Sequence, residues 1–343
     1  MKSCFSGCTS LTQAPVISGS VTNMRTCFWD CTSLTQAPVI PNGVTDMSYC
    51  FSGCRSLTQA PDIPSSVTDM NNCFHNCASL TQAPVIPNSV TDMSYCFAGC
   101  TRLTQAPDIP NSVINMSCCF ERCTSLTHAP VIPSSVTEIV ACFWGCESLT
   151  EPPEIPASVT NMENCFTNCK NLTKAPVIPD GVTNMGGCFS GCTSLKEAPE
   201  IPASVTGIAN CFQDCTSLTK APSSLPANVT NMHECFRNCT SLTKAPAIPD
   251  GVTSMTRCFQ YCGNLEEAPE IPQPVTYITS CFEGCSKIKG VVLKCNYRDS
   301  SFSDLFRGCN ALKAGSIKVP QGQLQIYKDH ARKMGTNENN FSE

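Results

Sequence analysis

The residues with the greatest chemical potential in this sequence of 343 residues are its 29 cysteines, and their spacing is regular. A Cys-Phe dipeptide recurs every 23 residues from Cys4 to Cys211, and after a step of 24 residues it resumes from Cys235 to Cys281. A second cysteine follows each phenylalanine by three residues, beginning with Cys8. Thiols in such a pattern have three uses: they bind a metal ion, form disulfides, or pack in the interior as small apolar groups.

The spacing favours the last of these uses. Two cysteines four residues apart on a helix hold their Cβ atoms about 5–6 Å apart, whereas a disulfide needs about 3.8 Å. Equivalent cysteines of neighbouring repeats come to about 4.8 Å, and an odd total leaves at least one thiol unpaired. We therefore predict columns of buried, reduced thiols, with some disulfides as the alternative. A metal site lacks a Cys-x-x-Cys pair and a pattern of histidine partners, so no metal or other cofactor is expected, and His75, His233 and His330 are interpreted as surface residues.

The elements that position these cysteines follow from one repeat, residues 41–63. A methionine, two cysteines and a phenylalanine within residues 47–54 stand at i, i+3, i+4 and i+7, which is the apolar stripe of a two-turn helix. The following segment, 56–60, is predicted to be a short strand that ends because the next proline cannot donate to a strand ladder. Stacked repeats would place these strands side by side as a parallel sheet, with the helices along the opposite face.

A repeat of this length with one leucine-led strand is the signature of a leucine-rich-repeat solenoid. The predicted fold is an α/β repeat of 23-residue units, with short parallel strands on one face and two-turn helices on the other. Leucine-rich repeats are expected over residues 1–285 with an uncapped N-terminal end, then a last degenerate repeat and C-terminal cap over 286–334, and a disordered tail over 335–343. The expected elements of the cap are two strands and a polar helix, at 289–294, 315–319 and 321–334.

The repeated pattern Cys-Phe-x-x-Cys-x-x-Leu-Thr-x-Ala-Pro-x-Ile-Pro-x-x-Val-Thr-x-Met covers nearly all of residues 4–320. It resembles the BspA-like leucine-rich repeats of bacterial surface antigens, such as those of treponemes, although alanine is commoner there at the first cysteine. The resemblance implies a surface-exposed or secreted solenoid that binds a ligand, often as an adhesin. No signal peptide opens the sequence, so we expect either a fragment of a longer protein or association through the uncapped N-terminal end.

Two outward positions flank the Ala-Pro of each repeat and are the candidate ligand-binding residues. The position before Ala-Pro changes from amides to alternating charges, at Gln59, Gln82, Gln105, His128, Glu151, Lys174, Glu197 and Lys220. The position after the proline carries a carboxylate in every second repeat, at Asp62, Asp108, Glu154 and Glu200, with valine between. The alternation separates like charges on neighbouring strands. Either it serves solubility alone, or these residues form a shallow polar strip that contacts a ligand.

Two further features each allow two interpretations. Asp46, Asp69 and Asp92 recur in register, and they are either oxygen ligands for a cation such as Ca²⁺ or N-caps of the predicted helices. The capping role is favoured because asparagine occupies the same column in other repeats. Trp29 and Trp144 follow the phenylalanine and are either anchors for a partner or local packing, and packing is favoured.

Composition restricts the class of function. With 22 Lys and Arg against 27 Asp and Glu, the net charge of -5 argues against a nucleic-acid partner, and no apolar run reaches the length of a membrane span. No constellation of nucleophile, base and acid interrupts the period, so an enzyme is not expected. The sequence thus predicts a non-enzymatic binding solenoid of the bacterial surface or secreted type that contacts protein or glycan. The alternative is an intracellular or structural interaction scaffold with reduced cysteine ladders.

Overall fold

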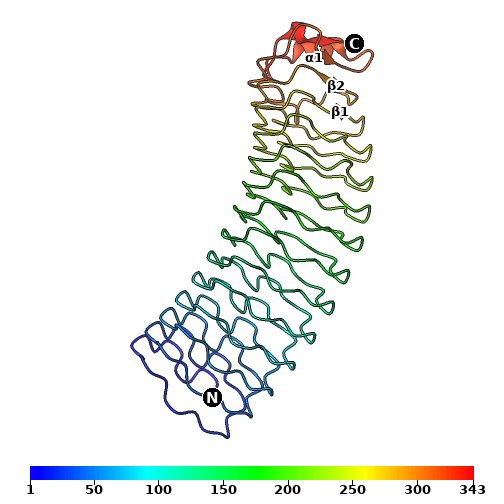
Figure 1. The fold of residues 1–343 in the computed structure, drawn as a ribbon. Coiled ribbons are helices and arrows are strands. Elements are labelled where there is room, and N and C mark those ends of the chain that lie inside the picture. The colour runs from blue at the N-terminus through cyan, green and yellow to red at the C-terminus, as the bar shows by residue number, and fades with distance from the viewer. The chain divides into compact units, whose positions relative to one another are not determined.

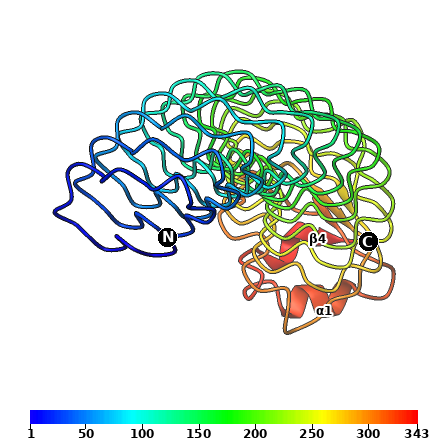
Figure 2. The ribbon, with the colours of Figure 1, turned by 90° about the horizontal axis from the view of Figure 1, so that it is seen from below.

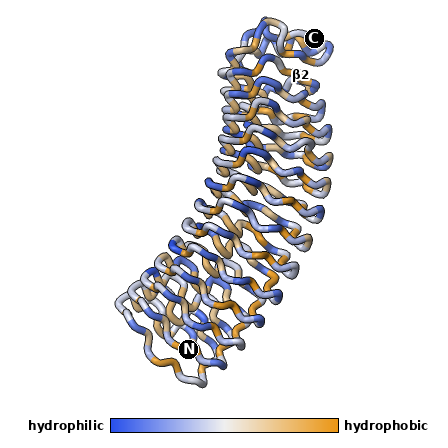
Figure 3. The backbone as a smooth tube through the Cα atoms, viewed as in Figure 1, coloured by the Kyte–Doolittle hydropathy of each residue, from blue (hydrophilic) through white to orange (hydrophobic).

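The computed structural model describes all 343 residues and divides into two compact units, residues 1–172 (unit 1) and 173–343 (unit 2). Each unit is a stack of rungs, one for each repeat of the sequence, and Figure 1 shows the rungs lying side by side within each unit. Apolar and polar stretches alternate along the rungs (Figure 3). The helices are all too short and too polar to cross a membrane.

The Cys-Phe segment of each rung is a chain of tight turns, so the predicted two-turn helix is wrong. In one rung of unit 1, the amides of Cys27 and Cys31 donate to carbonyls three residues earlier. The amides of Thr26, Phe28 and Asp30 instead donate to carbonyls of the next rung, at 2.7–3.0 Å. In an α-helix each amide donates to the carbonyl four residues earlier. Here every second amide donates to a carbonyl of the next rung instead, so a helix cannot form.

Left-handed backbone conformations make this path possible. In every rung the residue before the first cysteine and the residue before the second have positive φ, such as 52° at Thr26 and 54° at Asp30. Such a conformation costs about 1–2 kcal/mol for a residue other than glycine. The hydrogen bonds between rungs offset that cost, and they direct the apolar stripe inward without a helix.

From Gly7 to Gly191 the second left-handed column alternates between glycine and a larger residue, whereas Asp214, Asn238 and Tyr261 follow one another in consecutive rungs. Gly53 follows Asp30 and Gly99 follows Asn76, one rung later in each case. A Cβ atom on Gly53 would clash with the carboxylate of Asp30, and one on Gly99 would clash with the amide of Asn76. The larger side chain therefore lies over the glycine of the next rung, and this edge of the stack repeats every two rungs.

Columns of identical apolar residues fill the interior of each unit. The phenylalanines stack with ring centroids 5.3–5.8 Å apart from Phe5 to Phe166 in unit 1. In unit 2 they stack at 5.4–6.1 Å from Phe189 to Phe306. Buried leucine, valine and methionine columns run beside them. Because each rung covers the apolar residues of its neighbours, burial depends on stacking.

The strands expected at the leucine-led segments are reduced to isolated parallel bridges in most rungs. In this segment Gln13 is bridged to Gln36, and a second column of bridges, such as Asp46 to Asp69, follows the buried valine of the rungs, so the bridged positions lie 23 residues apart. The parallel arrangement of the rungs is confirmed, but the proline that follows each leucine-led segment limits the ladder to single residues.

The C-terminal part of unit 2 contains the regular elements of the chain. Its strands form a four-stranded parallel sheet in the order β1-β2-β3-β4, comprising Glu270–Ile271, Val291–Leu293, Ile317–Lys318 and Phe341–Ser342. Helix α1, Leu324–Asp329, buries Tyr327, whose hydroxyl donates to the Cys295 carbonyl at 2.8 Å. Figure 2 shows α1 and β4 in this end region.

The last nine residues differ from the sequence expectation. Residues 335–343, predicted to be disordered, include the 3-10 helix η1, Glu338–Asn340, and strand β4. Strand β4 pairs with β3 through Ile317 and Phe341, and the Phe341 side chain is buried. The segment is polar, which led to the prediction of disorder, but its one aromatic residue, Phe341, packs at the end of the core.

Candidate binding face

All twelve predicted ligand-binding side chains are exposed, and they lie on segments that share one face within each unit. We call this surface the A-P-x-I-P face, after the Ala-Pro-x-Ile-Pro segment that each rung contributes. Gln59 is bridged to Gln82 and Gln105 to His128 in unit 1, so these positions are neighbours on adjacent rungs. The corresponding bridge in unit 2 joins Glu197 to Lys220.

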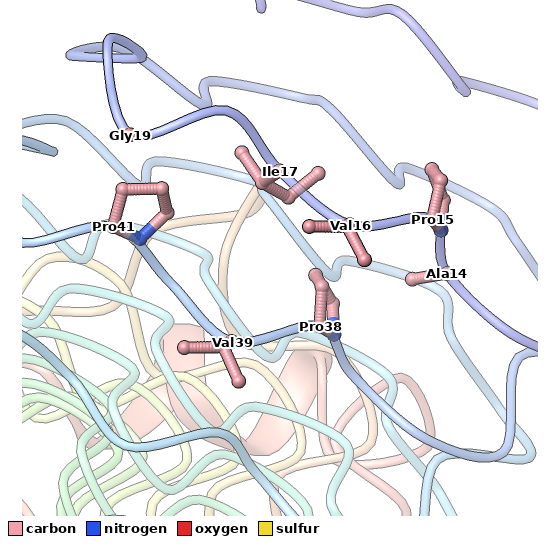
Figure 4. A pocket seen from close by; sticks show the side chains of 8 residues that line it. All are labelled: Ala14, Pro15, Val16, Ile17, Gly19, Pro38, Val39 and Pro41. Carbon is pink, nitrogen blue, oxygen red and sulfur yellow. The ribbon is translucent and has the colours of Figure 1, made fainter.

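Shallow grooves run between consecutive A-P-x-I-P segments. The first, with a volume of about 420 Å³, is lined by Pro15, Val16, Pro38 and Val39 among others, as Figure 4 shows. Two more grooves of unit 1 lie within residues 37–64 and 83–110, with volumes of about 560 and 260 Å³. In unit 2, grooves of about 480 and 390 Å³ lie within residues 173–199 and 175–202.

The valines of this face are almost fully exposed. Val16 is 99% exposed, and the exposed fractions of Val39, Val85, Val131 and Val177 are 86–89%. Single exposed apolar residues are common on protein surfaces, but a regular row of them is a feature of interaction sites. The sequence shows this alternation of valine and carboxylate, and the structure adds that the valines take no part in the core.

The charges of the face are arranged differently in the two units. In unit 1, Asp62, Asp108 and Glu154 form neither an ion pair nor a hydrogen bond. In unit 2, opposite charges on adjacent rungs pair, with nitrogen–oxygen distances of 3.4 Å for Lys220–Glu197 and 2.8 Å for Lys244–Glu267. In a third pair, Lys294, the residue that follows β2, contacts Glu270 of β1 at 2.5 Å. The carboxylates of Asp62, Asp108 and Glu154 are thus available to a partner.

The aspartate column has a capping function, although no helix follows it. The Oδ1 atom of Asp46 accepts from the Ser48 amide at 2.9 Å, and Asp69 accepts from Asn71 in the same way. Burial alone would raise the pKa of Asp46, but hydrogen bonds from Ser48 and Asn23 hold it below its ordinary value. Burial raises the pKa of Asp69. No group of three or more His, Cys, Asp or Glu side chains is arranged to hold a metal ion.

The cysteines are all unpaired, and 27 of the 29 are buried. In the second cysteine column each thiol donates to the carbonyl of the phenylalanine in the preceding rung, for example from Cys123 to Phe97 at 3.2 Å. Burial raises the pKa of the thiols, to about 12 at Cys100 and Cys262. A neutral thiol in such a site is a packing and hydrogen-bonding group and a poor nucleophile.

The two tryptophans lie away from the A-P-x-I-P face, on the turn side of the rungs. Trp29 is 44% exposed, whereas Trp144 is half-buried and has the guanidinium of Arg122 over its ring at 5.6 Å. His75, expected on the surface, is half-buried beside Tyr95, and its Nδ1 atom has no hydrogen-bond partner. Burial lowers the pKa of His75, so the ring favours its neutral form.

Sequence reasoning missed the two-rung pairing of the backbone. The bridges of the A-P-x-I-P face in unit 1 occur between alternate pairs of rungs only, at Gln13–Gln36, Gln59–Gln82 and Gln105–His128. The glycine column before the second cysteine alternates with the same period in unit 1, as does the valine column from Val39 onward. That coincidence of two alternating columns is visible in the sequence and could have revealed the pairing.

Stacked parallel rungs with a leucine at the start of each bridged segment define a leucine-rich-repeat solenoid. The model of the BspA type leucine rich repeat region (6 copies) matches residues 1–104, 93–219 and 209–331, and the chain belongs to this family. No protein among those with curated functions matches it.

Two solved structures have a similar fold. A leucine-rich repeat protein from Bacteroides ovatus ATCC 8483 is 23% identical, with a TM-score of 0.66, and the match covers 94% of this chain and 87% of that one. A leucine rich cell surface protein from Faecalibacterium prausnitzii A2-165 is 24% identical, with a TM-score of 0.58 and coverages of 84% and 88%. At these identities the similarity establishes the fold.

Proposed function

We propose that this chain is a non-enzymatic binding protein that is displayed on a cell surface or secreted, and that contacts a protein or glycan through the A-P-x-I-P face. The observation that carries the proposal is the row of valines that are 86–99% exposed among ordered polar residues. A monomeric protein gains no stability from apolar side chains left in water, so a regular row of them indicates a surface that is covered by a partner.

Family membership and one solved relative support the location. Leucine-rich repeats of this family are interaction modules. The structurally similar Faecalibacterium prausnitzii protein is described as a cell surface protein. Rigid rungs suit a binding role because the stacked backbone is already ordered and loses little further entropy when a ligand binds.

The alternative function is an intracellular or structural interaction scaffold. The state of the cysteines favours it, since 29 unpaired thiols are typical of a reducing compartment. Burial of 27 of them also protects the thiols from oxidation, and this allows the surface location.

Binding to an array of immobilised extracellular-matrix proteins and surface glycans tests the function. We expect specific binding by the full chain that is lost when Val85 and Val131 are both changed to serine. The matched control changes Ile114 and Tyr277 to serine, which are 50% and 60% exposed elsewhere on the chain. An equal loss of binding in the two variants, or no binding by the native chain, would overturn the proposal.

The charged part of the face is tested separately with Lys174→Glu and Lys220→Glu in one variant. We expect weaker binding of the same ligand if unit 2 contributes to the contact. Unchanged affinity would restrict the face to unit 1. Detection of the natural protein on intact cells, by an antibody that cannot enter them, distinguishes the surface location from the intracellular alternative.

A further inference from the structure

The backbone of the A-P-x-I-P face in unit 1 is organised in pairs of rungs. At each bridge the threonine before the glutamine donates its amide to the preceding rung, as Thr81 does to Thr58 at 3.4 Å. Its hydroxyl donates to the same carbonyl at 3.4 Å. Between the pairs these contacts are absent, and the grooves within residues 37–64 and 83–110 lie there.

The side chains follow the same period. In the second and third pairs the first rung carries a carboxylate and the second an exposed valine, as with Asp62 and Val85, then Asp108 and Val131, whereas the first pair carries Val16 and Val39. Rungs joined by a bridge lie about 4.8 Å apart, and the stacked rings of consecutive rungs are 5.7 Å apart, so equivalent carboxylates two rungs apart recur at roughly 10 Å. Any extended ligand that uses the whole row must present matching groups at that interval.

The charges select a cationic ligand. Unit 1 carries 6 Lys and Arg against 12 Asp and Glu, a net charge of -6, and Asp62, Asp108 and Glu154 have no cationic partner. Nucleic acids and acidic glycans are repelled by such a surface. Lysine or arginine side chains of a polypeptide supply the complementary charge.

The amides select a ligand whose backbone is free to hydrogen-bond. Exposed glutamine side chains, each with two donors and an acceptor, lie beside the carboxylate column at Gln36, Gln59, Gln82 and Gln105. An α-helix has already satisfied its backbone groups, and in a β-strand residues on one face recur at about 6.6–6.8 Å. A polyproline II chain has a solvated backbone and three residues per turn at 3.1 Å each, which is about 9.3 Å per turn.

We propose that the A-P-x-I-P face of unit 1 binds a polypeptide in the polyproline II conformation that carries lysine or arginine at every third position. The basic side chains pair with Asp62, Asp108 and Glu154, and the residues between them pack on the exposed valines. Backbone carbonyls and amides of the ligand hydrogen-bond with the glutamine row. This identifies the partner class of the binding face and therefore rests on the proposed function.

The test uses a fluorescently labelled 12-residue peptide, four copies of Pro-Pro-Lys, and the full native chain in a polarisation titration. Such a peptide spans about 37 Å, enough to reach all three carboxylates. Peptides of the same length and lysine count, with the lysines at every second position or in one block, test the period. We expect the period-three peptide to bind at least tenfold more tightly than either, with affinity that falls as salt rises.

Variants assign the contact to the face. Replacing Asp62, Asp108 and Glu154 with Asn, Asn and Gln is expected to weaken binding about tenfold. The control replaces Glu138, Asp180 and Asp250 in the same way, which removes equal charge from exposed positions outside this column. Circular dichroism and the melting temperature establish that both variants fold.

Three outcomes would overturn the inference: no binding of the period-three peptide, equal binding of all three peptides, or equal loss in the two triple variants. If the chain binds a matrix protein or glycan on the array but not this peptide, the proposed function stands and the partner class assigned here is wrong. If it binds neither, both are wrong.

Discussion

Unit 1 carries 6 Lys and Arg against 12 Asp and Glu, whereas unit 2 carries 16 against 15. The two units nevertheless contain the same buried columns of cysteine, phenylalanine and leucine, with phenylalanine rings stacked at nearly the same distances. The interior is constrained because every rung must fit the rungs on both sides of it. Outward residues touch few neighbours, so they can acquire different charges without altering the backbone. The two units should therefore differ in what they bind, whereas equivalent substitutions in their interiors should change the stability of both by similar amounts.

Alkaline pH is expected to have the largest effect, and to affect both units. Burial raises the pKa of Cys100 and Cys262 from the ordinary value of 9.0 to about 12, so these thiols contribute their full stabilisation below pH 9. As pH rises from 9 toward 12, the unfolded chain loses protons that the folded chain keeps. Each such thiol then lowers the free energy of unfolding by about 1.4 kcal/mol per pH unit. Urea titrations under reducing conditions between pH 7 and 10.5 measure it, and a constant midpoint would contradict the buried thiol columns.

Removing one stacked ring should cost the same in either unit. Phe97→Ala in unit 1 and Phe236→Ala in unit 2 each delete a fully buried side chain. Each is expected to lower the free energy of unfolding by about 3–5 kcal/mol, since a cavity remains between fixed rungs. Urea denaturation followed by circular dichroism compares them. A difference of more than about 2 kcal/mol would show that the two interiors are not equivalent.

The left-handed glycines provide a finer comparison. Gly99→Ala is expected to destabilise unit 1 by about 2 kcal/mol, because it adds left-handed strain and a clash with Asn76. The double variant Asn76→Gly, Gly99→Ala should recover the part that is due to the clash. Gly308→Ala in unit 2 serves as the control, because its Cβ atom would lie 3.4 Å from Gly284 and meet only ordinary contact. The melting temperatures of the three variants measure these effects. Equal decreases in Gly99→Ala and Gly308→Ala would refute the two-rung packing.

Surface charge reversal should have the smallest effect on stability. Lys220→Glu replaces the exposed pair with Glu197 by a repulsion and is expected to cost less than about 1 kcal/mol. Salt at 0.5 M should remove most of that difference. In unit 1, Gln82→Glu introduces one charge beside uncharged neighbours and should change the melting temperature less. A larger effect in unit 1 would mean that its amide row stabilises the fold.

The sequence predicted the parallel stack, the buried thiols and the exposed columns correctly, because each depends on the spacing of apolar and proline residues. It predicted the wrong local conformation for the Cys-Phe segment. Residues at i, i+3, i+4 and i+7 face one way on a helix, but tight turns linked through left-handed residues such as Thr26 and Asp30 bring the same residues inward. Hydrogen bonds to the next rung decide between the two, and a single repeat contains no information about them.

The candidate face was predicted only in part for a related reason. Exposure of Gln59 or Asp62 follows from alternation along one rung. The pairing of rungs depends on contacts between residues 23 positions apart, such as the amide of Thr81 with the carbonyl of Thr58. The tail was predicted wrongly because Phe341 gains its burial only from residues far away in the sequence.

The alternation of glycine with larger left-handed residues limits how genes for such proteins can change in length. Deleting one 23-residue segment would place two large residues, such as Asp30 and Asn76, in consecutive positions of the column, an arrangement that unit 2 accommodates where the Asn238 amide donates to Asp214 at 2.9 Å. Deleting or duplicating 46 residues preserves the alternation. Recombination within residues 7–191 should therefore leave the packing of this column unchanged in steps of 46 residues, whereas a step of 23 residues requires new contacts between the large side chains.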